Sequence, residues 1–92
     1  MRIYLTVIVK SKVEFQDEIK NMLYNLPELS RKESACIKYD VHQSIDAENI
    51  FVLNEVWESL EGLDHHNRQP YSQAFFESFD KLEENPLIFR SR

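Results

Sequence analysis

The sequence predicts an α+β domain in which strands and helices follow the order β-α-β-β-α-β. Three observations lead to this order. Two apolar runs rich in β-branched residues, 3–9 and 50–57, have the composition of strands that are covered on both faces. A third run, 35–42, alternates in polarity like a strand with one buried face. Between and after these runs, apolar residues recur at spacings of three and four, which is typical of amphipathic helices.

The boundaries of these elements carry their own signals. The segment Ser11-Lys12-Val13-Glu14 has the form of a capping box and predicts the start of the first helix. The polar segment 44–49 predicts a turn that joins the second and third strands. Ser59 can cap a short helix, and Pro70 can occupy the first turn of the next one. The short apolar run 87–89 then predicts the last strand.

This order is that of a ferredoxin-like fold, in which a four-stranded antiparallel sheet carries its helices on one face. A single domain over residues 2–91 accounts for all the elements. Helices on one face cannot cover strands that are apolar on both, so the other face of the sheet needs a partner. We therefore expect a homodimer whose two sheets pack face to face, forming a dimeric α+β barrel.

Composition excludes several classes of partner. The 92 residues include 16 Asp and Glu against 11 Lys and Arg, a formal charge of −5, and no basic run exceeds Arg31-Lys32, so nucleic acid is not expected. The first apolar run is too short to span a membrane and has no signal-type cleavage site, which predicts a cytoplasmic protein without membrane contact. The single cysteine, Cys36, cannot form an internal disulfide and is expected to be a small buried hydrophobic residue.

His66 is the best candidate for acid–base chemistry. It follows Leu63 by three residues, which puts its ring on the buried side of a short helix, near Tyr71 and Phe75. A buried imidazole that faces a cavity can accept a proton from a phenol. The alternative is a histidine that is hydrogen-bonded within the core or at a helix cap.

Glu55 stands inside an otherwise apolar strand, where an ionised carboxylate is costly unless it is paired. It must meet a cation, backbone donors or the dimer partner. Arg31 and Arg90 are the candidate cations, and the sequence does not decide between them.

Aromatic side chains could line a pocket for a flat polycyclic or quinone-like ligand, although aromatic residues at these spacings also build cores. The candidate substrate-binding residues are Trp57, Tyr71, Glu55, Tyr39, His42 and Phe75. A facial metal triad of His42, Glu55 and His66 lacks the short regular spacings of metal sites, so no metal is expected.

Two blocks of the sequence carry a family resemblance. Residues 30–42, SRKESACIKYDVH, resemble the pattern R-x-E-x-G-C-x-x-Y, with Ala35 in place of the usual glycine. The segment 55–57, followed by Leu63 and then 66–71, resembles E-x-W and L-x-x-H-x-x-x-P-[HY]. Both patterns are typical of the antibiotic biosynthesis monooxygenase family, and the chain resembles its quinol monooxygenases.

The resemblance implies a dimeric ferredoxin-like domain with a pocket between sheet and helices. Many members oxygenate quinols, anthrones or related phenols with dioxygen and without flavin, haem or metal, so no cofactor is expected. By this analogy His66 accepts the substrate proton or orients the substrate, and Trp57 and Tyr71 form pocket walls. Arg31 and Glu33 are expected to be mainly structural.

Other functions within the family stay open at this point. Haem degradation is disfavoured, because Thr6, His66 and Phe76 stand at the positions that we align with the residues of the haem-degrading members. A non-catalytic module that binds a small metabolite would use the same pocket. An isomerase of a small phosphorylated diketone would need converging cations, for which Arg31, Arg68 and Arg90 are available.

Overall fold

A computed structural model describes all 92 residues. Its elements follow the predicted order, with two short 3-10 helices in addition. They are β1 (Ile3–Lys10), η1 (Val13–Phe15), α1 (Gln16–Ser30), β2 (Cys36–Gln43), β3 (Ile50–Trp57), α2 (Leu60–Asn67), α3 (Pro70–Glu77), η2 (Phe79–Lys81) and β4 (Leu87–Ser91). No helix is long and apolar enough to cross a lipid bilayer.

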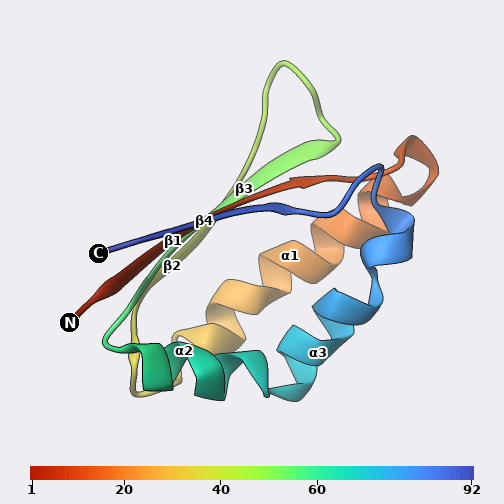
Figure 1. Ribbon diagram of the computed structural model, residues 1–92. Coiled ribbons are helices and arrows are strands. Elements are labelled where there is room, and N and C mark those ends of the chain that lie inside the picture. The colour runs from red at the N-terminus through yellow and green to blue at the C-terminus, as the bar shows by residue number, and fades with distance from the viewer.

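The four strands form one antiparallel sheet in the order β2-β3-β1-β4. The three α-helices lie together on one side of this sheet (Figure 1). β1 and β4 are antiparallel neighbours, so the two chain ends come out side by side (Figure 1). The predicted α+β ferredoxin-like fold is therefore confirmed.

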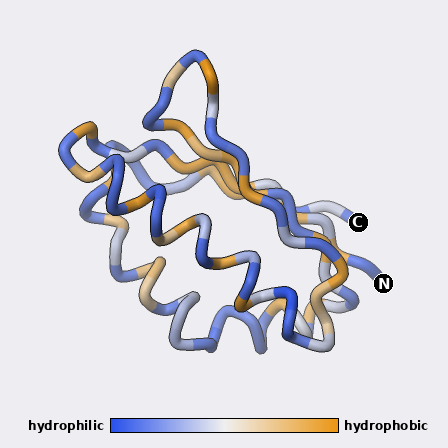
Figure 2. Tube along the Cα trace, turned by 180° about the vertical axis from the view of Figure 1, so that it is seen from behind, coloured by the Kyte–Doolittle hydropathy of each residue, from blue (hydrophilic) through white to orange (hydrophobic).

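Only one face of the sheet is buried by the chain itself. In β1 the burial alternates, with Val7 and Val9 buried against the helices while Tyr4 on the opposite face is 44% exposed. β3 alternates in the same way. These strands are the most continuously hydrophobic parts of the trace (Figure 2). Within one chain the helices cover only one face of these strands, as the fold predicts, so the expected cover of the other face is not supplied by the chain itself.

A β-bulge in β2 changes the predicted alternation. Cys36 pairs with Trp57 but Lys38 pairs with Val56, so Ile37 is the extra residue between them. The bulge puts Cys36 on the helix-facing side together with Tyr39, whereas the simple alternation predicts opposite sides. It also aligns Tyr39 with Glu55 on the neighbouring strand.

The helix starts were predicted with mixed success. Ser59 accepts a hydrogen bond from the Gly62 amide and Pro70 opens α3, as expected. Ser11 does not cap α1, because it is fully buried and tied to the β2–β3 loop through Asn49. Its amide donates to the Asn49 carbonyl over 2.9 Å, and the Asn49 side chain donates back to the Ser11 carbonyl over 2.9 Å.

Candidate active site

A cavity of about 110 Å³ lies between the helix-facing side of the sheet and the helices. Nine of its 14 lining residues are hydrophobic, and the polar ones include a carboxyl, an imidazole and a guanidinium group. The lining residues are Leu5, Val7, Leu26, Tyr39, Leu53, Glu55, Leu63, His66, Asn67, Ser72, Phe75, Phe76, Ile88 and Arg90. A small apolar pocket with a few converging polar groups is the usual form of a small-molecule site.

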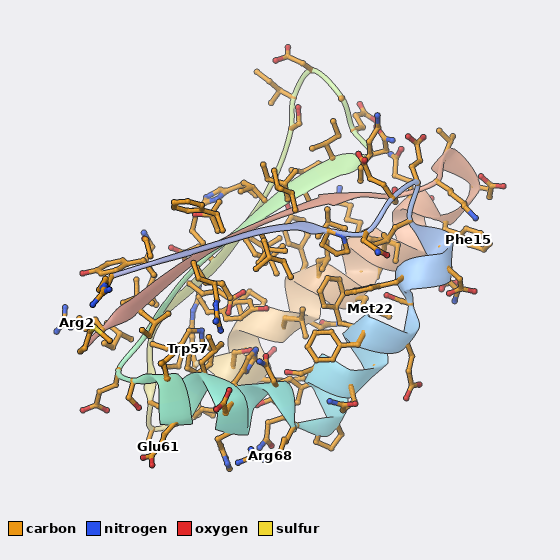
Figure 3. All side chains as sticks on the ribbon, viewed as in Figure 1. Arg2, Phe15, Met22, Trp57, Glu61 and Arg68 are labelled. Atoms are coloured by element: carbon orange, nitrogen blue, oxygen red, sulfur yellow. The ribbon has the colours of Figure 1, made fainter.

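His66 reaches the cavity because α2 turns one face inward. The Ser59 cap starts this helix, and the spacing of three residues then buries Leu63 and His66 on the same side. The His66 side chain is 7% exposed. Its ring stacks on Trp57 with ring centres 4.3 Å apart and an angle of 34° between the planes. Trp57 points from the end of β3 into the space above α2 (Figure 3).

Glu33 holds one side of the His66 ring. Glu33 lies in the loop between α1 and β2, and its Oε2 is 2.7 Å from Nδ1 of His66. The Tyr71 hydroxyl donates to the same oxygen over 2.5 Å. The Glu33 side chain is 9% exposed, and its Oε1 is buried without a hydrogen-bond partner. One carboxylate oxygen thus connects α2, α3 and the α1–β2 loop.

The other ring nitrogen of His66 belongs to the cavity side. Nε2 is 3.3 Å from the hydroxyl of Ser72, which also lines the cavity. Burial lowers the pKa of His66, because it disfavours the charged imidazolium more than the hydrogen bond and charge of Glu33 favour it. Burial thus favours the neutral form of the ring, which is the form that can accept a proton.

Glu55 is a second ionisable group in the cavity. Burial raises the pKa of its carboxyl to about 7, while the hydrogen bond from Trp57 Nε1, 2.9 Å from Oε1, lowers it. Neither candidate arginine forms an ion pair with it. Arg31 instead binds the Asp40 carboxylate and the Tyr39 carbonyl, each over 2.8 Å. Sequence reasoning did not foresee the indole as the donor.

The structure brings most of the predicted site residues together. Tyr39, Glu55, His66 and Phe75 line the cavity, whereas Trp57 and Tyr71 contact the His66 ring from outside the lining. His42 is exposed and faces away from the helices, as its pairing with Val52 shows. His42, Glu55 and His66 therefore do not converge as a metal triad.

Two polar residues of the site were missed as functional candidates. From the sequence alone, Glu33 is expected to have a mainly structural role, and Ser72 is not considered. Glu33 lies in a loop, where no periodicity indicates the direction of a side chain. Its place in the R-x-E pattern was the one available signal.

The sheet order defines a ferredoxin-like α+β domain, and a partly open, mainly apolar cavity lies between its sheet and helices. Residues 3–78 match the family model for antibiotic biosynthesis monooxygenases, and the chain belongs to this family.

Three relatives illustrate the match. An uncharacterized protein of Synechocystis is 31% identical over 78 residues, which are 85% of this chain and 53% of that protein, so this chain spans about half of it. A Bacillus subtilis protein named "Putative monooxygenase YcnE" is 29% identical over 85 residues, 92% of this chain and 90% of that protein. A solved structure from Mycobacterium tuberculosis superimposes with a TM-score of 0.93 at 18% identity, covering 100% of this chain and 94% of that one.

Proposed function

We propose that this protein is a cofactor-independent monooxygenase or oxidase of a quinol-like or phenolic small molecule. The observation that carries the proposal is the buried imidazole of His66, which lines a mainly apolar cavity and is held on its far side by Glu33. Membership of the antibiotic biosynthesis monooxygenase family supports the same reaction type.

The chemistry needs little from the protein beyond a base and a dry pocket. His66 Nε2 would take the proton of a ring hydroxyl, and the resulting phenolate is electron-rich enough to reduce dioxygen. Oxygen would then bond to a ring carbon, which loses its hydrogen as a proton. The O–O bond breaks, one oxygen stays on the ring as a carbonyl, and the other leaves as water. The four electrons that this requires come from the quinol, which ends as a hydroxyquinone.

The size of the cavity favours a single ring over a polycyclic substrate. An engineered cavity of about 150 Å³ binds benzene, whereas drug-sized ligands occupy roughly 300–1,000 Å³. The cavity here is smaller than either, at about 110 Å³, so even a single ring must extend through its open side. Two of its lining residues, Phe76 and Ile88, are 38% and 52% exposed, so substituents of the ring could extend past them.

The cations near the cavity give less support to a phosphorylated substrate than the imidazole gives to a phenolic one. An isomerase of a phosphorylated diketone would need several cations at one place. Arg90 lines the cavity, but Arg31 is paired with Asp40 and Arg68 extends away from the sheet (Figure 3).

Homodimerisation is part of the proposal. The outer face of the sheet carries apolar side chains from β1 and β4, with Tyr4 44%, Leu87 66% and Phe89 64% exposed. A face of this kind is typical of a contact between subunits. A second copy of the chain, packed sheet to sheet, would cover it. Light scattering at micromolar concentration tests this, and a stable monomer contradicts it.

Oxygen consumption tests the reaction. Metal-stripped protein is supplied with single-ring hydroquinones, naphthohydroquinones and anthrones, and His66→Ala is compared with His65→Ala. His65 is exposed and adjacent in the sequence, so it controls for the loss of a histidine from α2. We expect uptake with single-ring quinols that His66→Ala abolishes and His65→Ala retains.

Two results would contradict the proposal. Unchanged turnover in His66→Ala removes this residue from the mechanism. Saturable quenching of Trp57 fluorescence by quinols without any oxygen uptake indicates a binding module instead.

A further inference from the structure

We propose that Glu33 is the positioning residue of this site: it keeps the proton of the neutral His66 ring on Nδ1, so that Nε2 faces the cavity as the proton acceptor. The role of His66 in this statement rests on the proposed function. Which ring nitrogen of His66 carries the proton does not depend on the proposed function, and it can be measured without a substrate.

The hydrogen-bond pattern supports this assignment. An ionised carboxylate accepts hydrogen bonds and has no proton to give. The hydroxyl of Tyr71 donates its one hydrogen bond to Glu33 Oε2, and His66 Nδ1 lies 2.7 Å from the same oxygen. A contact of this length needs a proton on Nδ1, since two acceptors so close would repel each other. A neutral ring with its proton on Nδ1 has a bare Nε2.

The cavity side of the ring fits the same state. Ser72 Oγ, 3.3 Å from Nε2, can rotate its hydrogen towards a bare nitrogen. This hydrogen bond is long, so a substrate hydroxyl could replace it at little cost. The arrangement of carboxylate, imidazole and cavity matches the general pattern of a base that is oriented by a third group.

Charge gives Glu33 a second effect, which begins once the proton has moved. The imidazolium formed at His66 would lie beside the Glu33 carboxylate, and the two side chains are only 7% and 9% exposed. Attraction between opposite charges is stronger in such surroundings than in water. Glu33 Oε1 has no hydrogen-bond partner in the protein, so the carboxylate meets His66 and Tyr71 through Oε2 alone.

The test is nitrogen NMR of histidine in the substrate-free protein, which distinguishes protonated from bare ring nitrogens. The chain has three histidines, and the His66→Ala spectrum assigns the His66 signals. In the wild type we expect a protonated Nδ1 and a bare Nε2. A wild-type ring protonated on Nε2 overturns the proposal without any variant.

Glu33→Gln is the informative substitution. If its amide NH₂ group occupies the place of Oε2, it can donate to His66 Nδ1 and to the Tyr71 oxygen, and the amide oxygen takes the place where Oε1 already has no partner. We therefore expect the proton of the ring to move to Nε2. Glu28→Gln removes the same charge from an exposed position of α1 and should leave the His66 signals unchanged.

Kinetics give the second readout. With any compound that the protein oxidises, Glu33→Gln should lower kcat by about 10²-fold, which is the usual contribution of a general base. It should change KM little. Unchanged His66 signals in folded Glu33→Gln overturn the proposal, whatever the value of kcat. The NMR result decides the role of Glu33 even if no compound is oxidised, so the proposed function and this inference fail separately.

Discussion

Replacing Glu55 with glutamine should stabilise the protein at pH 8 and have much less effect at pH 5. Glutamine keeps the shape of the side chain and an oxygen that can accept the hydrogen bond from Trp57 Nε1. It removes only the ability to ionise. The substitution therefore isolates the cost of a carboxylate buried in β3.

The magnitude follows from the pKa. Burial raises the pKa of Glu55 from 4.5 to about 7, so the folded protein binds this proton more tightly than the unfolded chain. Stability from this group is fully present below pH 4.5 and is lost as the pH rises to about 7. A difference of about 2.5 pH units at 1.36 kcal/mol each makes ionisation cost about 3 kcal/mol at pH 8.

Other charged groups near Glu55 act on both proteins alike. His66 lines the same cavity, and its lowered pKa makes stability fall when the pH drops through its range. Glu33 raises the pKa of Glu55 by repulsion, and Arg90 lies in the cavity lining. These groups are unchanged in Glu55→Gln, so the difference between the two proteins reports the ionisation of Glu55, including the repulsion from Glu33.

Urea unfolding of both proteins between pH 4.5 and 8.5, at one protein concentration, is the assay. We expect the free energy of unfolding of Glu55→Gln to exceed that of the wild type by up to about 3 kcal/mol at pH 8. Glu58→Gln, at an exposed neighbouring position, should show no such pH-dependent gain. A Glu55→Gln difference that stays the same from pH 5 to pH 8 would refute the reasoning.

Three further predictions concern packing and assembly. Gly62→Ala should lower stability by roughly 1–3 kcal/mol, because its Cβ would overlap that of Ala35, and adding Ala35→Gly should restore it in thermal unfolding. Val56→Asp, on the outer sheet face, should convert a dimer into monomers in light scattering without loss of helical circular dichroism. Burial raises the pKa of the Cys36 thiol to about 11, so iodoacetamide at pH 8 should alkylate it at least about tenfold more slowly than in the urea-unfolded chain. Equal rates would contradict this.

Residue spacing predicted the fold well because it reports which side chains share a face. The spacing from Leu63 to His66 was enough to place the imidazole inward, and the structure agrees. The same reasoning failed at Ser11, where contacts with Asn49 override the local capping signal. It also failed in β2, where the bulge at Ile37 shifts the alternation by one residue.

The sequence by itself therefore determined the order of the elements, the inward face of α2 and the family, because each depends on local patterns along the chain. Only the tertiary structure decided which groups meet at the site. Glu33 and Tyr71 are 38 residues apart, and their meeting at one carboxylate oxygen depends on how a loop packs against α3. The fit of Ala35 against Gly62 arises in the same way, from two segments that no spacing rule connects.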